Sequence, residues 1–368
     1  MPTEKGKKTK PEKLKQAKKG NSKKVQIKAD FERTSWIKRS SIKYLKWNYF
    51  FSVIFRLFRF LLLLGGAFVI LLPFFTMIAG SFMTHADVVD VTVRLIPRYP
   101  TLATYAAIIQ DNNFLPILGV TAVLSIVVAL LQMAVCCLIG YGLAKFKFRG
   151  NAIIMAAVIV SLIIPHEMLR LSMQGHMREF DFFWDLGLFR APGLLSLIGG
   201  IGLPVGPMNL MDTYAPLILL SITGFGFKNG LFIFIFRQYF KGVPDELEES
   251  AYIDGSGVFR TFFKVILPLS VPMMITVFLL AFSWQWTDEF YAGMFFRQAA
   301  GAPARLLPDI ITRIPSSLML PQGTGGEELF YVTIRNTTGL MIIIPLVIVY
   351  LFFQRKLIQG IERSGITG

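Results

Sequence analysis

The sequence predicts an all-α membrane protein with about six transmembrane helices. Of its 368 residues, 54% are hydrophobic and only 17% are charged, whereas about a quarter of the residues in an average soluble domain are charged. The charges are clustered, so long uncharged runs lie between them. An apolar run of roughly 18 or more residues is long enough to span a membrane as a helix. The runs are too long for transmembrane β-strands and lack their alternating pattern, so helices are the prediction.

Six segments are predicted to span the membrane. Four uncharged runs are long enough by themselves: 60–84, 112–144, 265–287 and 336–354. The segment 151–165 is shorter and has an alternative end beyond His166, and the segment 213–236 is interrupted by Lys228. The uncharged stretch 191–211 contains five glycines and three prolines, which disfavour a straight helix. It is predicted to be a loop or a partly inserted hairpin, with a seventh span as the alternative.

The distribution of basic residues predicts the orientation. The first 50 residues hold 16 Lys+Arg against 4 Asp+Glu, and cytoplasmic loops carry an excess of Lys and Arg. With this end of the chain inside, the other inside segments hold 10 Lys+Arg in 48 residues, and the outside segments hold 9 in 122. The inside segments are 145–150, 237–264 and 355–368, and the outside segments are 85–111, 166–212 and 288–335. We therefore expect both termini in the cytoplasm.

The domain organisation follows from the same pattern. Residues 1–52 are predicted to be a basic cytoplasmic tail, too polar to pack a core, and residues 53–365 to be the transmembrane domain. Attraction to anionic membrane lipids, or a simple role in fixing topology, explains the tail better than nucleic-acid binding does. Cys136 and Cys137 are adjacent in an apolar run and are expected to be small buried residues.

The inside loop 237–264 is predicted to contain a short helix, 244–254. Pro244 suits a first helical position, and four acidic residues follow it within five positions, near the positive end of the helix dipole. Gly255 can adopt the left-handed conformation that ends a helix. An isolated helix of this length is marginal in water. We therefore expect it to be held against another surface, with a second protein as one candidate.

This loop resembles the signature of the inner-membrane permeases of ATP-binding-cassette importers. The signature is Glu-Ala-Ala, three residues, Gly, nine residues, Ile, one residue and Leu-Pro. The corresponding residues here are Glu249-Ser250-Ala251, Gly255, Val265 and Leu267-Pro268. The spacing is kept throughout. Ser250 replaces an alanine and Val265 an isoleucine, and both changes are small.

Other segments are similar to the carbohydrate branch of that family, and in particular to the second permease of maltose-type transporters. They occur in the family's order over about residues 60–365. These segments are Pro97 with Pro100-Thr101-Leu102 and Tyr105, the turn 140–150, Ile164-Pro165, 236–240, 283–288, and 353–356 with Gly360. The long N-terminal tail and an insertion around 180–205 depart from the family pattern, and the resemblance assigns no role to either.

The resemblance implies a type I importer permease fold in the bacterial plasma membrane and a helix that couples transport to a separate ATPase. The implied coupling residues are Leu247, Glu248, Glu249, Ser250, Ala251, Asp254, Gly255, Leu267 and Pro268. The implied partners are a second permease as heterodimer, an ATPase dimer and an extracytoplasmic solute-binding protein, with a sugar or oligosaccharide as substrate. Because the chain has no Gly-x-x-x-x-Gly-Lys-Ser/Thr loop, we expect no cofactor here, and ATP and Mg²⁺ on the ATPase.

Lys228 and the outer end of the fifth predicted span are candidates for the substrate path. Lys228 is a charge inside a predicted span, and such charges face a cavity or a partner. The favoured alternative is a structural lysine at a helix break made by nearby glycines. Trp284, Trp286 and Asp288 could contact a sugar, but an aromatic belt at the membrane interface is the favoured interpretation for the tryptophans.

Two other functional classes remain as alternatives. A secondary transporter driven by an ion gradient needs coupling groups near the midplane, and only Lys228 qualifies. A membrane enzyme is disfavoured because no serine or cysteine lies convincingly beside a base. His166-Glu167 resembles the start of a zinc-protease motif, but residue 170 is arginine, so the second histidine ligand is missing. We therefore predict a transporter subunit, with no metal site and no catalytic residues.

Overall fold

The computed structural model describes residues 47–180, 208–226, 228–296 and 305–365. The chain divides into two units, residues 1–74 and 75–368. Within the described residues, the regular elements are helices, and the one bridge pairs Phe180 with Met208. Most of the predicted basic tail and residues 181–207 of the predicted insertion lie outside the described residues.

The described part of the first unit belongs to helix α3, Trp47–Gly80, which has 34 residues and contains Pro73. The helix begins earlier than the predicted span 60–84. Its apolar side chains are exposed, for example Phe55 at 73% and Val69 at 68%. Exposed apolar side chains on a helix of this length are what a lipid-facing span requires.

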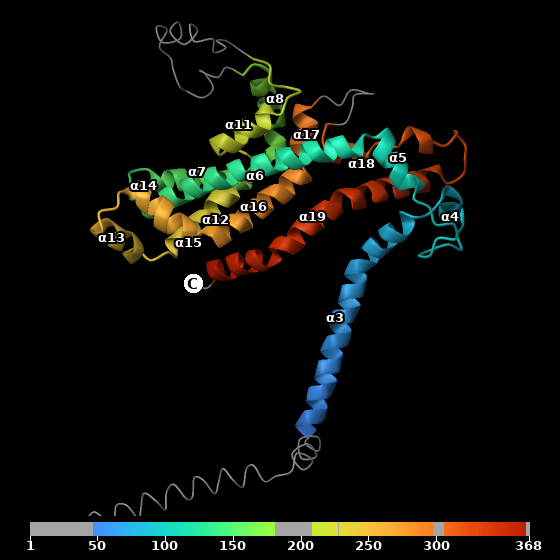
Figure 1. The fold of residues 1–368 in the computed structure, drawn as a ribbon, viewed down its shortest axis with the longest axis horizontal. Coiled ribbons are helices and arrows are strands. Elements are labelled where there is room, and N and C mark those ends of the chain that lie inside the picture. The colour runs from blue at the N-terminus through green and yellow to red at the C-terminus, as the bar shows by residue number, and fades with distance from the viewer. Residues whose placement is uncertain (1–46, 181–207, 227, 297–304, 366–368) are drawn as a thin grey trace, which may run out of the picture. The chain divides into compact units, whose positions relative to one another are not determined.

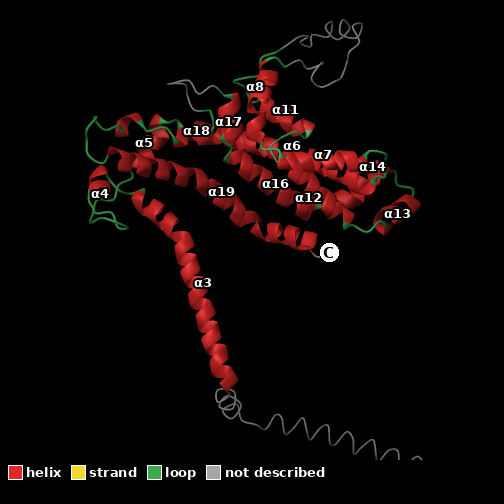
Figure 2. Ribbon diagram, turned by 180° about the vertical axis from the view of Figure 1, so that it is seen from behind, coloured by secondary structure: helices red, strands yellow, loops and turns green. Residues whose placement is uncertain are grey.

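The second unit is organised around α6, Phe114–Lys145. This 32-residue helix packs against α11 (Ala215–Thr223), α12 (Asn229–Lys241) and α16 (Val271–Trp286), and α16 also packs against α19 (Glu327–Gly365). Figures 1 and 2 show α6, α12, α16 and α19 running side by side. Their shared core consists of large apolar side chains and the two cysteines, including Cys136, Cys137, Phe232, Phe236, Phe240, Val277 and Trp286. The cysteines are therefore buried, as predicted.

A glycine sets the closest approach between α6 and α12. A Cβ on Gly140 would lie 2.5 Å from the Cβ of Phe236 and 3.0 Å from the backbone nitrogen of Arg237. Such distances are far inside van der Waals contact, so only glycine fits at this point. The fully buried Phe236 and Phe240 then fill the space beside it.

Shorter helices connect these long ones. Two of them precede α6: α4 (His85–Val89) and α5 (Ala103–Asp111). Three lie between α6 and α11: α7 (Asn151–Ile163), η1 (His166–Leu169) and α8 (Arg170–Arg178). After α12 they are α13 (Glu246–Ile253), α14 (Val258–Thr261), the π-helical turn η2 (Phe262–Ile266), α15 (Leu267–Leu269), α17 (Phe290–Phe295), α18 (Leu307–Ile311) and η3 (Ser316–Leu318).

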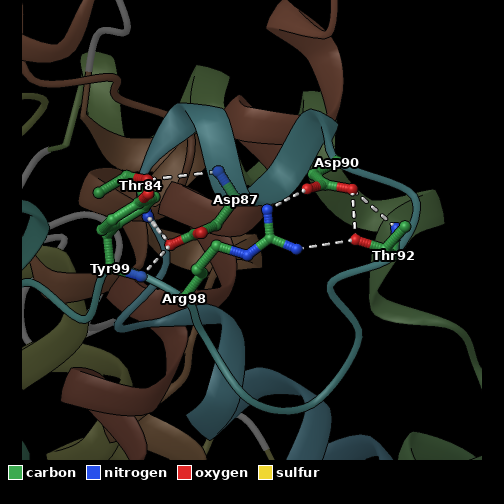
Figure 3. A network of polar contacts seen from close by, with 6 residues as sticks. All are labelled: Thr84, Asp87, Asp90, Thr92, Arg98 and Tyr99. Carbon is green, nitrogen blue, oxygen red and sulfur yellow. Dashed lines mark hydrogen bonds and ion pairs between the residues drawn. The ribbon is translucent and has the colours of Figure 1, made fainter.

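Polar side chains organise the segment that follows α3. Figure 3 shows the network, which consists of Thr84, Asp87, Asp90, Thr92, Arg98 and Tyr99. The Asp87 side chain accepts a hydrogen bond from the backbone nitrogen of Thr84 at 3.4 Å, and the Asp87 backbone nitrogen donates to Oγ1 of Thr84 at 3.3 Å, which closes a capping box at α4. Asp87 also accepts a hydrogen bond from the backbone nitrogen of Tyr99 at 3.2 Å. Arg98 forms an ion pair of 3.1 Å with Asp90. These contacts hold the chain between α4 and α5 in a defined turn.

The described residues contain three helices that are long and apolar enough to cross a membrane: Phe50–Gly80, Phe114–Lys145 and Glu327–Ile358. The number rises to five if two bent helix pairs each count as one span. These pairs are Asn151–Ile163 with His166–Arg178, bent by 95°, and Val258–Leu269 with Val271–Trp286, bent by 74°. Pro165 follows the end of α7, where a proline disfavours helix in the residue before it.

The predicted span 213–236 is not one continuous helix. Helix α11 ends at Thr223 and α12 begins at Asn229. Gly224 and Lys228 both have left-handed backbones, with φ of +82° and +65°, and neither conformation continues an α-helix. The helix break that was the favoured explanation of Lys228 is therefore present. The apolar length of the segment did not show that this break divides it into two helices.

Candidate functional site: α13 and the end of α6

Helix α13 occupies the centre of the predicted coupling loop. It spans Glu246–Ile253, two residues inside the predicted start and one inside the predicted end. Glu246, Glu248 and Glu249 lie in its first turn, where negative charge stabilises the helix dipole.

Gly255 closes α13 as predicted. Its φ is +79°, and its backbone nitrogen donates to the carbonyl of Tyr252 at 3.0 Å. The next residue, Ser256, donates to the carbonyl of Ala251 at 2.9 Å. Bonds of this kind satisfy the last carbonyls of a helix and direct the chain away from it. No atom lies within 4 Å of a Cβ built on Gly255, so the backbone conformation alone favours glycine there.

One face of α13 is turned inward and the other outward. Glu248 and Ala251 are buried, whereas Leu247 is 40% and Ile253 86% exposed. Glu249, Ser250 and Asp254 are exposed as well. The outward face therefore combines acidic and apolar side chains, a composition suited to a protein partner.

Lys145, the last residue of α6, contacts the start of α13 and the residues before it. Its Nζ donates to the carbonyl oxygen of Val243 and to Oδ1 of Asp245, both at 2.6 Å, and lies 3.8 Å from Oε1 of Glu248. The Lys145 side chain is only 6% exposed. Because a buried ammonium must be compensated by nearby oxygens, these three contacts fix the lysine between α6 and α13.

The pKa values of the two carboxyl groups beside Lys145 are shifted in opposite directions. The hydrogen bond from Lys145 lowers the pKa of Asp245, whose side chain is 79% exposed. Burial raises the pKa of Glu248, against the opposing effect of the Lys145 charge. The neighbouring Tyr141 ring packs on Phe240 at 5.4 Å and on Phe262 at 4.7 Å between centroids. The ends of α6, α12 and η2 therefore meet directly behind α13.

The sequence places Lys145 in the turn 140–150 and among the basic residues that predict the orientation, but it predicts no contact between Lys145 and α13. Its partners lie about one hundred residues away along the chain, at separations of 98 and 100 positions. The one available signal was that the residue belongs to a family-like turn. In the structure, Lys145 contacts Asp245 and Glu248 of the predicted coupling loop, and Tyr141 packs on Phe240 and Phe262 at the same end of α6.

The second half of the signature lies at the bend between α14 and α16. Leu267 and Pro268 begin α15, directly after the π-helical turn η2. Pro268 lies one residue before the end of the helical run Val258–Leu269, where a residue without a backbone N–H favours an end or a bend of the helix. The signature therefore comprises α13, which presents an outward face, and residues next to the 74° bend between the helical run Val258–Leu269 and α16.

The candidates for a substrate path are only partly brought together. The Nζ of Lys228 lies 5.8 Å from the centroid of the Trp284 ring, within the range of a cation–π interaction. Trp284 itself stacks on Phe232 at 5.5 Å. Lys228 also lines a cavity of about 650 Å³ between the α7–η1 bend and the α11–α12 break, together with His166 and Glu167.

Trp286 and Asp288 are buried and contact other parts of the chain. The Trp286 side chain is 2% exposed, and its Nε1 donates to the carbonyl of Ile342 on α19 at 2.9 Å. A tryptophan of an aromatic belt would face lipid, whereas α19 covers the side of α16 on which Trp286 lies. Asp288 accepts the backbone N–H of Tyr291 at 3.1 Å, and burial raises its pKa to about 6.

Within the part of the chain that the structure describes, the three histidines lie apart from any cluster of metal-ligating side chains. Among the described residues, no group of three or more His, Cys, Asp or Glu side chains is close enough to hold a metal ion. His85 contacts the carbonyl of Gly325 at 3.0 Å and the ring of Phe330 at 5.4 Å.

Comparisons with known proteins agree with this geometry. Residues 136–363 match the family model of the binding-protein-dependent transport system inner membrane component. The chain is 27% identical to Protein LplC of Bacillus subtilis over 84% of this chain and 93% of the relative. It is 26% identical to the arabinooligosaccharides transport system permease protein AraQ of Halalkalibacterium halodurans, over 82% and 93%. It is 30% identical to the alpha-glucoside transport system permease protein AglG of Rhizobium meliloti, over 75% and 63%.

A solved structure shares the fold. It is a bacterial ABC transporter involved in the import of the acidic polysaccharide alginate, with a TM-score of 0.58 and 20% sequence identity. The match covers 82% of this chain and 96% of that one. The family match over more than half of the sequence shows that the chain belongs to the binding-protein-dependent transport system inner membrane components, the multi-pass permeases of ABC importers that work with an ATPase and a solute-binding protein.

Proposed function

We propose that this chain is one of two related permease subunits of an ATP-driven importer for a sugar or oligosaccharide. One observation supports this most directly. Helix α13 is closed at Gly255, is held from behind by Lys145, and presents an acidic and apolar outer face. That arrangement suits docking on an ATPase dimer, which binds the ATP and Mg²⁺. The named substrates of AraQ and AglG support a carbohydrate as the cargo.

The proposed mechanism is alternating access without chemistry on this chain. Closure of the ATPase dimer moves α13, and the motion passes through the bend at Leu267 and Pro268 into α16 and through Lys145 into α6. The second permease completes the pathway, and the solute-binding protein delivers the sugar from outside. Both termini and α13 then lie in the cytoplasm.

Gly255 gives the sharpest test of this function, and Gly257 is its matched control. Neither position has an atom within 4 Å of a built Cβ, but φ is +79° at Gly255 and −77° at Gly257. Alanine therefore costs roughly 1 kcal/mol at Gly255 through backbone conformation and little at Gly257. We expect Gly255→Ala to lower substrate-stimulated ATP hydrolysis and uptake in proteoliposomes, and Gly257→Ala to leave both unchanged. If Gly255→Ala transports normally, or uptake follows an ion gradient without ATP, the proposal is wrong.

The orientation can be tested with single cysteines. Lys147 and Gln322 are both exposed, while the native Cys136 and Cys137 are 0% and 1% exposed, so background labelling is low. In intact cells, an impermeant maleimide should label Gln322→Cys and should label Lys147→Cys only after the membrane is opened. External labelling of Lys147→Cys would contradict the proposed topology.

We further infer that Lys228 belongs to the substrate path. The cavity beside it and the left-handed backbone that places it at the α11–α12 break support this assignment. Lys228→Gln is expected to raise the KM for uptake while basal ATP hydrolysis stays unchanged. An unchanged KM would assign the lysine to a structural role next to Trp284.

A further inference from the structure

A basic hollow lies beside the helix ends on the α13 side of the molecule. It measures about 660 Å³ and lies between the α6–α7 turn and the end of α12. Four of its lining residues are basic, and none of its lining residues is acidic. The basic residues are Lys147, Arg149, Arg237 and Lys241. A concentration of positive charge at a helix end on the cytoplasmic side of a membrane protein suits an anionic lipid headgroup.

Hydrogen bonds build the wall of this hollow. Gly150 turns the chain with a φ of +100°, and the side-chain amide of Asn151 donates to the carbonyls of Leu143 at 3.2 Å and Phe146 at 3.0 Å. Arg237 of α12 donates from Nε to the same Leu143 carbonyl, at 3.4 Å. The turn and α12 are therefore connected through the Leu143 carbonyl at the end of α6, and the basic side chains come from two connected elements.

The positive charge of the hollow is not neutralised within the described residues. None of its four basic groups forms an ion pair with a carboxylate there, since the ion pairs in the described ranges involve Arg98 and Lys145. The nearby Asp245 is engaged by Lys145 at 2.6 Å. Lys147 lies close enough to contribute to the lowered pKa of Asp245, but only after the larger effect of Lys145. The hollow therefore has positive charge available for an anion.

Apolar surface beside the hollow distinguishes a lipid from a free anion. Phe146 and Phe148 line the hollow and are 43% and 44% exposed. Helix α7 starts at the rim and exposes Ile153 at 75% and Ile154 at 45%. Exposed apolar residues along a membrane helix are suited to acyl chains. A phospholipid would fill both parts, with its phosphate at the basic residues and its chains along α7, whereas inorganic phosphate would use only the first part.

We propose that the α6–α7 turn and the end of α12 form a binding site for the headgroup of an anionic phospholipid. The lipid belongs to the leaflet on the α13 side, and its phosphate is received by Lys147, Arg149, Arg237 and Lys241. This site is separate from the ATPase-coupling face of α13. It adjoins the lysine contact behind α13, because Lys147 is two residues beyond Lys145.

The test compares two double variants of the purified complex in nanodiscs. Lys147→Gln/Lys241→Gln removes two exposed charges from the hollow. Arg260→Gln/Lys264→Gln removes two exposed charges from α14 and η2, outside the hollow, and is the control. Retained phosphatidylglycerol and phosphatidylcholine are counted by native mass spectrometry. The hollow variant should retain phosphatidylglycerol more weakly by about fivefold per charge, or about 25-fold in all, and the control should match the wild type.

Three outcomes would overturn the proposal. The first is equal loss of phosphatidylglycerol in both double variants, which would show an unspecific attraction to the membrane surface. The second is displacement of the lipid by millimolar inorganic phosphate, which would show a site for a small anion. The third is loss of the ATPase from the hollow variant in phosphatidylcholine alone, which would show that these cations bind the ATPase. The importer function is tested separately, by the effect of Gly255→Ala on uptake. If Gly255→Ala lowers uptake and the hollow variant keeps its phosphatidylglycerol, the lipid site is refuted and the importer function is not.

Discussion

Replacing Lys145 with methionine isolates the contact between α6 and α13. The methionine keeps most of the length and apolar stem of the lysine but removes the ammonium group. The carbonyl of Val243 and the buried Glu248 then lose their cation, while the exposed Asp245 returns to water. Since breaking a buried charge pair leaves an uncompensated charge, the variant should weaken the position of α13 rather than the fold of the spans.

The magnitude follows from the burial of the groups left behind. The Glu248 side chain is 11% exposed and lies 3.8 Å from Lys145, too far for a strong hydrogen bond. An unsatisfied buried polar group costs about 1–3 kcal/mol, and the raised pKa of Glu248 allows it to take up a proton instead of staying charged. We therefore expect about 2 kcal/mol, which is about 30-fold in the equilibrium for local opening of α13.

Hydrogen exchange of the α13 amides is the direct assay. In Lys145→Met, the amides of Glu249 to Ile253 should exchange about 30-fold faster, and coupled ATP hydrolysis should fall with them. The control is Lys264→Met, which removes an exposed lysine from η2. A second variant, Lys145→Met/Glu248→Leu, removes both charges and should recover most of the protection. Unchanged exchange in Lys145→Met, together with normal coupling, would refute the role assigned to this lysine.

Two further predictions concern the core and a buried acid. Gly140→Ala should separate α6 from α12 and destabilise the protein by about 1–3 kcal/mol, whereas Gly142→Ala, which meets no atom within 4 Å, should not; equal melting temperatures for the two would contradict the packing argument. Asp288 has a pKa raised to about 6, so the stability it contributes is present below its ordinary value of 3.8 and is lost as pH rises through about 6. Asp288→Asn should therefore be at least as stable as wild type at pH 7.5 and lose that advantage at pH 4, as measured by thermal unfolding at both pH values.

Local chemistry explains which parts of the site could be predicted from sequence. The acidic first turn and Gly255 act within a few residues, so the short helix and its end could be located without a structure. The contact of Lys145 with Asp245 connects residues 100 positions apart. A local sequence pattern cannot predict a contact between residues so far apart in the chain. The fold class and family were accessible because apolar run lengths and motif spacing are properties of the chain itself.

The differences in the transmembrane region have a different cause. Hydropathy measures how apolar a segment is, but it does not report backbone conformation, so 213–236 resembled one span although Gly224 and Lys228 interrupt it. The position of Trp286 depends on α19 covering α16, and that contact forms between segments 56 residues apart. Predictions from a single segment therefore place a span in the chain but do not fix which of its faces meets lipid and which meets protein.

Cross-linking from Ile253 tests the central claim that α13 docks on the ATPase. Ile253 is 86% exposed at the end of α13, and the buried native cysteines leave an Ile253→Cys thiol as the reactive group among the described residues. In the assembled importer, a short bifunctional cross-linker should join Ile253→Cys to the ATPase subunit and should not join Gln322→Cys to it. A complex that hydrolyses ATP with substrate stimulation but yields no ATPase product from Ile253→Cys, or yields it from Gln322→Cys instead, would contradict the account.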